Sequence, residues 1–135
     1  MFKSKQEILD LVAERLFETK KKSVLPDSDG DESQCQYLSP EGDKCAIGLL
    51  IPKGKYKKRF DLESVHPLEV LYHVGLLPAK NDNEMRSFLG DLQRCHDTCL
   101  STEGEPFWKE FSDNVRVTCK RFKLEAPSNL APEES

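Results

Sequence analysis

The sequence lacks a long apolar run, a large excess of one charge and any cysteine pair at the two-residue spacing of a zinc knuckle. No run reaches the roughly 18 apolar residues that a membrane-spanning helix needs. Residues 1–5 (MFKSK) lead into an amphipathic pattern rather than into the apolar stretch of a signal peptide. The formal net charge is only −4, which argues against an overall basic field that draws a protein onto nucleic acid. We therefore expect a cytoplasmic protein with no membrane contact.

Cysteine is present, but its pattern indicates free thiols. The chain has five cysteines, an odd number, and no secretion signal, so a disulfide framework is not expected. No two of them are separated by only two residues, the spacing that makes a zinc motif strong. We expect no cofactor.

The length of 135 residues suits one domain with a core. We assign residues 1–124 to a single globular domain. Residues 125–135 (EAPSNLAPEES) are predicted to form a flexible C-terminal tail.

Local signals predict about four helices. A capping box at residues 4–7 (SKQE) and apolar residues at steps of three and four predict a helix over residues 5–20. The lysines at its end, residues 20–22, are expected to be solvated. Pro67 as a first helical residue and a glycine stop predict a short helix over residues 67–74. Two longer helices are expected to begin near Asn81 and at Pro106, and the first of them carries a stripe formed by Met85, Phe88, Leu89, Leu92, Cys95 and Cys99.

Residues 35–47 predict a small antiparallel β-hairpin. The tetrapeptide Ser39-Pro40-Glu41-Gly42 suits a type I turn. Alternation about that turn puts four side chains on one face, laid on the helices: Cys35, Tyr37, Cys45 and Ile47. Gly48 indicates a close backbone approach or a bend where the strand ends. The expected fold class is α+β, mainly α-helical with this one hairpin packed on the helices.

Cys45 and His96 are the candidate catalytic residues. A reactive thiolate needs a partner that lowers its pKa, and His96 is the most plausible of three histidines. Asp97 is not expected to orient His96, because neighbours on a helix point about 100° apart. The competing interpretation is favoured, since free cysteine is among the most buried residue types and packs as a small apolar residue.

A zinc site is the second hypothesis, and the spacing of its ligands argues against it. Convergence of four of the candidates would be needed for a tetrahedral site. The candidates are Cys35, Cys45, Cys95, His96 and Cys99. We expect no metal, because the helix cysteines lie in an apolar stripe.

The basic segment, residues 53–59 (KGKYKKR), is the candidate binding site. Five cations lie among its seven residues, and Tyr56 and the following Phe60 are interleaved with them. Such a pattern is able to grip phosphates while an aromatic ring stacks on a base, and it also suits an acidic protein surface. The binding residues are therefore predicted to be Lys53, Lys55, Tyr56, Lys57, Lys58 and Arg59. A solvated loop without a partner is the simpler alternative.

Two short motifs stand out in the sequence. The first is Cys-x-Tyr followed by a glycine turn and Cys-Ala-Ile-Gly-x-Leu-Ile-Pro, here residues 35–52. The second is Leu-Gln-x-x-His-Asp, here residues 92–97. Together they resemble the motifs of a family of small bacterial and phage proteins of unknown function. The resemblance runs over most of residues 5–122, and implies a bacterial or phage origin without an activity. The lysine-rich stretch after Pro52 departs from the family, which usually has an acidic stretch there.

These observations predict a small cytosolic binding protein that is not an enzyme. Its partner is expected to be a protein, or nucleic acid through residues 53–59. The alternative is a thiol-dependent enzyme or a zinc-bearing protein built on Cys35, Cys45 and His96.

Overall fold

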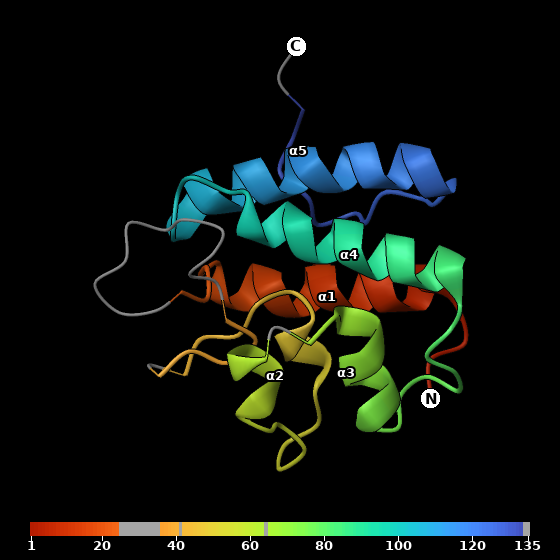
Figure 1. The fold of residues 1–135 in the computed structure, drawn as a ribbon. Helices are drawn as coiled ribbons and strands as arrows, with labels where there is room; N and C mark the ends of the chain where they lie inside the picture. Colours follow the sequence, from red (N-terminus) through yellow and green to blue (C-terminus); the bar gives the residue numbers. More distant parts are fainter. Residues whose placement is uncertain (25–35, 41, 64, 134–135) are drawn as a thin grey trace.

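The computed structural model describes residues 1–24, 36–40, 42–63 and 65–133, and Figure 1 shows how their helices are arranged. These residues form five α-helices and one short 3-10 helix. In chain order the elements are α1 (Lys5–Thr19), η2 (Gly48–Leu50), α2 (Arg59–Leu62), α3 (Pro67–His73), α4 (Asn83–Asp97) and α5 (Gly104–Phe122).

The predicted β-hairpin is wrong, and the fold class is mainly α rather than α+β. The turn is present: the Ser39 N–H donates to the Asp43 carbonyl at 2.8 Å, and Leu38 and Lys44 form an isolated antiparallel bridge. Beyond the bridge the chain coils toward η2, so no strand forms within the described residues. The reason is burial, because residues 45–48 are all buried in succession. A hairpin with one face on the helices would expose every second residue instead.

The predicted long helices are confirmed, and two of them begin at the expected signals; the third, α5, begins at Gly104, two residues before the predicted start at Pro106. The Ser4 hydroxyl accepts from the Glu7 N–H at 3.1 Å and caps α1, as the capping box predicts. Asp82 caps α4 by accepting from the Met85 N–H at 3.0 Å. α3 begins at Pro67 as expected, whereas the one-turn helix α2 was not predicted.

The expectation of a solvated lysine run after α1 is wrong at its last residue. α1 ends at Thr19, and Lys20 takes a left-handed conformation with φ of 47°. The chain then turns inward, so that Lys22 is only 3% exposed. Its ammonium donates to the Cys99 carbonyl at 2.6 Å, which provides a polar partner inside the protein.

Helix α4 lies at the centre of the molecule. It packs against α5 on one side and against α3 and α1 on others, while η2 packs on α1 (Figure 1). The largest fully buried side chains are aromatic: Phe60, Phe88, Phe107, Trp108 and Phe111. The segment that precedes α2 projects from the edge of the molecule opposite α5 (Figure 1).

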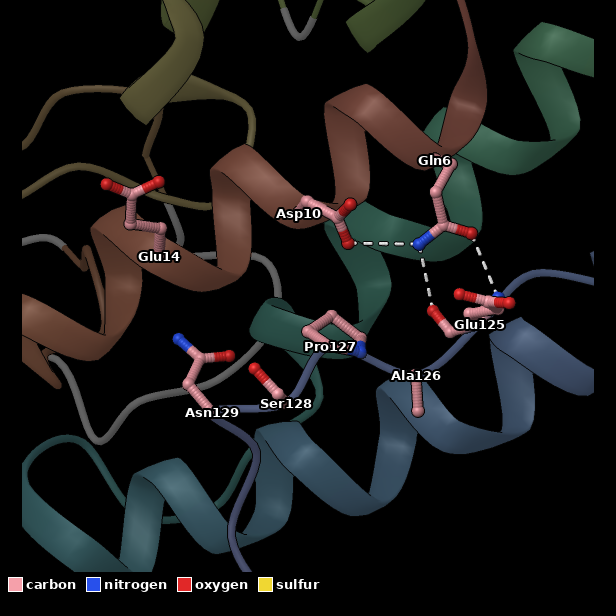
Figure 2. Close-up of a pocket in the computed structure, with 8 residues that line it drawn as sticks. All are labelled: Gln6, Asp10, Glu14, Glu125, Ala126, Pro127, Ser128 and Asn129. Carbon is pink, nitrogen blue, oxygen red and sulfur yellow. Dashed lines mark hydrogen bonds between the residues drawn. The ribbon is translucent and has the colours of Figure 1, made fainter.

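Residues 125–131, predicted as part of a flexible tail, pack along α1 and α5. The Gln6 amide accepts from the Glu125 N–H and donates to the Glu125 carbonyl, both at 2.9 Å (Figure 2). Further along, Asn129 donates to the Ala13 carbonyl at 3.0 Å, and its own carbonyl accepts from the Trp108 indole at 3.2 Å. These contacts attach Glu125 and Asn129 to α1 and α5, and the flexible tail over residues 125–135 stays a prediction. Among the described residues, no helix combines the length and apolar character needed to cross a membrane.

Candidate functional site

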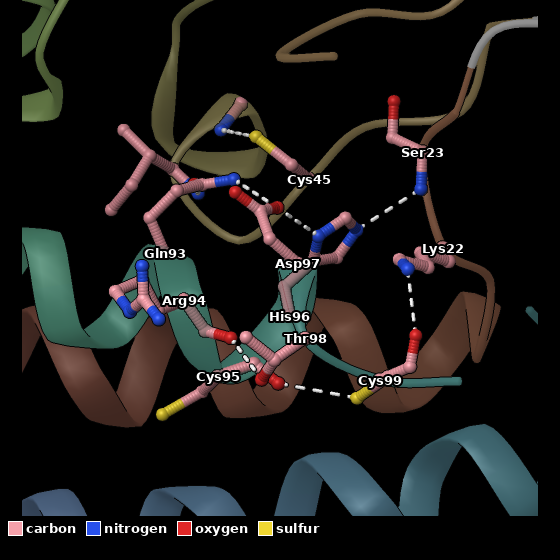
Figure 3. Close-up of polar contacts among 12 residues, drawn as sticks. Lys22, Ser23, Cys45, Gln93, Arg94, Cys95, His96, Asp97, Thr98 and Cys99 are labelled. Atoms are coloured by element: carbon pink, nitrogen blue, oxygen red, sulfur yellow. Dashed lines mark hydrogen bonds and ion pairs between the residues drawn. The ribbon is translucent and has the colours of Figure 1, made fainter. Parts of the chain in front are cut away.

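The two motifs behind the family resemblance meet in the core, where Figure 3 shows their polar contacts. The Gln93 carbonyl oxygen accepts from the Ile47 N–H at 3.1 Å, so α4 holds the turn that leads into η2. Cys45 Sγ accepts from the Gly48 N–H at 3.3 Å inside that turn. The Gln93 amide also donates to Asp97 Oδ1 at 2.8 Å. We call this group the motif cluster; its members are Ser23, Cys45, Gln93, His96 and Asp97.

His96 is fully buried in the motif cluster and has both ring nitrogens occupied. Nε2 accepts from the Ser23 N–H at 3.0 Å, so the ring proton lies on Nδ1. Nδ1 faces Asp97 Oδ1 at 2.7 Å and donates to it. The expectation that Asp97 does not orient His96 is therefore wrong. The Cβ atoms of the two residues point about 100° apart on the helix. Their side chains nevertheless bend toward each other, and the ring nitrogen and the carboxylate meet.

Cys45 has the environment of a packing residue. Its side chain is fully buried. Burial raises the pKa of the thiol well above its usual range, and the nearby Asp97 carboxylate raises it further. A nucleophilic cysteine needs the opposite shift and access to a substrate. With His96 Nε2 already engaged by Ser23, the geometry gives the predicted pair no catalytic arrangement.

The remaining zinc candidates do not converge in the described part of the chain. Cys95 Sγ lies 3.3 Å from Thr118 Oγ1, and Cys99 donates to the Cys95 carbonyl at 3.2 Å. Burial raises the pKa of both thiols to about 12. Within residues 1–24, 36–40, 42–63 and 65–133, no three His, Cys, Asp or Glu side chains are grouped to hold a metal ion. Cys35 lies outside the described residues.

The basic segment lies at the surface. Its four lysines are exposed and form no ion pair with the residues that the structure describes: Lys53, Lys55, Lys57 and Lys58. The guanidinium of Arg59 lies 5.3 Å from the centre of the Phe60 ring. Phe60 itself is fully buried, so it is not available to stack on a ligand.

A small cleft opens beside the basic segment. Its volume is about 150 Å³, and we call it the tyrosine cleft. Its lining comes from three stretches of the chain: Tyr37, Leu38, Lys44, Gly48, Ile51, Pro52, Lys53, Gly54 and Tyr56. The predicted binding residues Lys53 and Tyr56 therefore belong both to the basic segment and to the wall of this cleft.

Asp61 holds the two tyrosines of the cleft in place. Its Oδ1 accepts from the Tyr37 N–H at 2.7 Å, and its Oδ2 accepts from the Tyr56 hydroxyl at 2.5 Å. The Tyr37 hydroxyl donates to the Val65 carbonyl. Burial raises the pKa of both phenols above their usual range, and Asp61 adds to this effect at Tyr56. Both hydroxyls therefore stay protonated near neutral pH, which argues against an acid–base role for either tyrosine.

Gly48 fixes the inner wall of the tyrosine cleft. A Cβ atom at this position would lie 2.0 Å from the Tyr37 carbonyl oxygen, which no real side chain tolerates. The predicted close backbone approach is thus confirmed. The cleft was not predicted from the sequence, because it forms from residues brought together by the turn. The one local signal is an acid, Asp61, two positions after the basic segment.

Comparison with protein-family models, with curated proteins and with solved structures returned no match for this chain. The family resemblance therefore stays a prediction.

Proposed function

We propose that this chain is a non-enzymatic binding protein, and that the basic segment is the surface that contacts its partner. The observation that carries the proposal is the set of exposed lysines without ion-pair partners in the described part of a chain of net charge −4. Crowded like charges repel one another, and a partner of opposite charge relieves that repulsion. Such a patch also speeds association by steering the partner.

A protein partner fits this surface better than nucleic acid. Proteins that bind single strands present aromatic rings as open stacking platforms along a basic groove. Here Phe60 is buried and Tyr37 is only 8% exposed. We propose a cytoplasmic location in a bacterium or a phage-infected cell, on the strength of the resemblance.

The thiol-dependent and zinc-bearing alternatives are not proposed. Cys45 and His96 are sealed in the core and hydrogen-bonded there, so no observation favours either chemistry.

A charge-reversal pull-down tests the proposal. The variant Lys55→Glu/Lys57→Glu/Lys58→Glu changes three exposed side chains. The matched control, Lys3→Glu/Lys21→Glu/Lys120→Glu, changes the net charge equally at three exposed positions elsewhere. We expect the wild type and the control to retain a partner from bacterial lysate, and the first variant to lose it.

Nuclease treatment of the lysate separates the two partner classes. Retention after treatment supports a protein partner, and loss of the captured material indicates nucleic acid instead. Equal capture by both triple variants would remove the basic segment from the function.

A further inference from the structure

The tyrosine cleft and the basic segment share residues, so any ligand of one contacts the other. Lys53 lines the cleft and begins the segment, while Tyr56 lines the cleft from the middle of it. Lys44, from the turn before η2, adds a further exposed ammonium to the lining. An apolar hollow and a row of cations therefore lie side by side on one face.

The walls of the cleft offer carbon atoms rather than hydrogen-bonding groups. The hydroxyls of Tyr37 and Tyr56 donate to the Val65 carbonyl and to Asp61, so both donor protons are already used within the protein. The other uncharged lining residues are aliphatic, proline or glycine. Because the polar atoms of both tyrosines are satisfied within the protein, an apolar group entering the cleft leaves no donor unpaired.

The size of the cleft matches one side chain. A cavity of about 150 Å³ lined by apolar side chains holds one benzene molecule. The tyrosine cleft has about that volume, which suits a leucine, methionine or phenylalanine side chain. The edges of a nucleobase carry several donors and acceptors, for which a mostly apolar lining offers few partners, so the cleft suits an apolar side chain better.

We propose that the partner presents an acidic peptide segment with one bulky apolar residue, which inserts into the tyrosine cleft while flanking carboxylates pair with the lysines around it. Those lysines are Lys44, Lys53 and Lys55. The apolar anchor supplies short-range affinity, and the charges supply orientation and speed of association. This inference rests on the proposed function and specifies the partner that the basic segment binds.

Peptide titrations test the anchor. The probes are fluorescently labelled runs of glutamate interrupted by leucine, phenylalanine, alanine or serine, compared with a DNA oligonucleotide of equal charge. Polarisation is measured at low ionic strength, where surface charge is least screened. We expect the leucine and phenylalanine peptides to bind about tenfold or more tightly than the serine peptide.

A matched pair of substitutions tests whether the apolar residue of the peptide binds in the tyrosine cleft. Leu38→Trp adds bulk to the lining of the cleft, whereas Leu62→Trp makes the same change at a side chain that is 82% exposed near the basic segment and is absent from the lining. The leucine-over-serine preference should vanish in the first variant and persist in the second. Pro52→Phe, at an exposed lining residue, serves as a second blocking variant if Leu38→Trp fails to fold.

Each other result overturns a distinct statement. If all peptides bind equally, and the variant Lys55→Glu/Lys57→Glu/Lys58→Glu binds none of them, the apolar anchor is rejected and the proposed function stands. Tighter lysine-dependent binding of the oligonucleotide would reject a peptide partner. Failure of every acidic probe to bind would contradict the proposed function together with the anchor.

Discussion

The motif cluster and the basic segment differ in what their side chains are free to do. In the motif cluster, rare and reactive residue types are enclosed, and every hydrogen bond of His96 and Cys45 ends on the protein itself. In the basic segment, the four lysines are exposed and form no ion pair with the residues that the structure describes. The comparison teaches that chemical identity is a poor guide to function until burial and hydrogen-bond satisfaction are known.

The largest effect is expected at Gly48, where the motif cluster meets the tyrosine cleft. Gly48→Ala should lower the free energy of unfolding by about 3 kcal/mol, because the new methyl group collides with the backbone of Tyr37. Chemical denaturation measures the change. Gly90→Ala in α4 is the control: its methyl group would meet His66 Nε2 at 3.4 Å, and helix propensity should stabilise it by up to about 1 kcal/mol. A cost below about 1 kcal/mol at Gly48 would contradict the close approach.

Truncation of His96 should have the next largest effect. His96→Ala leaves the Ser23 N–H without its acceptor and should cost about 2 to 3 kcal/mol in a denaturant titration. His96→Gln, which restores an acceptor, and His96→Asn, which restores a donor toward Asp97, should each cost less. His73→Ala, at an exposed histidine, should change stability by less than about 0.5 kcal/mol. Equal costs at the two histidines would show that the buried hydrogen bonds contribute nothing.

The free energy of unfolding should fall at alkaline pH, because two buried thiols ionise more readily in the unfolded chain. Cys95 and Cys99 have a pKa of about 12 in the folded protein, whereas a thiol in an unfolded chain has a pKa of about 8.5. Between about pH 9 and 12 the folded state therefore binds more protons than the unfolded state, so stability falls as pH rises. Each thiol contributes up to about 1.4 kcal/mol per pH unit.

The cysteine contribution is isolated by substitution. Cys95→Ala removes one titrating thiol, so its stability should fall less steeply than that of the wild type between about pH 9 and 11. Identical slopes would mean that the Cys95 thiol ionises equally in both states. Fluorescence-monitored denaturation at several pH values gives both slopes.

The smallest effect on stability is expected in the basic segment. Lys55→Gln/Lys57→Gln/Lys58→Gln should change the free energy of unfolding by less than about 0.5 kcal/mol, because these side chains are exposed and unpaired in the described structure. The same substitution at Lys22, which is 3% exposed, should cost about 2 kcal/mol. Thermal melting of both variants checks the pair, and similar melting temperatures would contradict the difference in burial.

The sequence predicted features that depend on neighbouring residues. The starts of α1 and α3 were found because Ser4 and Pro67 act on the turn that follows them. The prediction of a hairpin failed because the Ile47 N–H bonds to Gln93, which lies 46 positions further along the chain. A local pattern contains no information about that partner, so an apolar run enclosed on all sides was interpreted as a strand with one buried face.

The candidate site shows the same division. Exposure of the lysines in the basic segment was predictable from their density, whereas the tyrosine cleft required Tyr37 and Tyr56 to meet across Asp61. The burial of Lys22 was also not predictable from the local sequence, because its hydrogen-bond partner is the carbonyl of Cys99, which follows α4 in the chain.

The pairing of the Gln6 amide with Glu125 has a consequence for the order in which the chain folds. The two residues are 119 positions apart, and the Asn129 contact with Ala13 spans 116. Contacts that close loops of this length carry a large entropy cost and form late. On the ribosome, α1 is made before residues 125–129 and gains this part of its packing only after they have emerged. Until then the Gln6 amide and the Ala13 carbonyl lack these partners and remain hydrated.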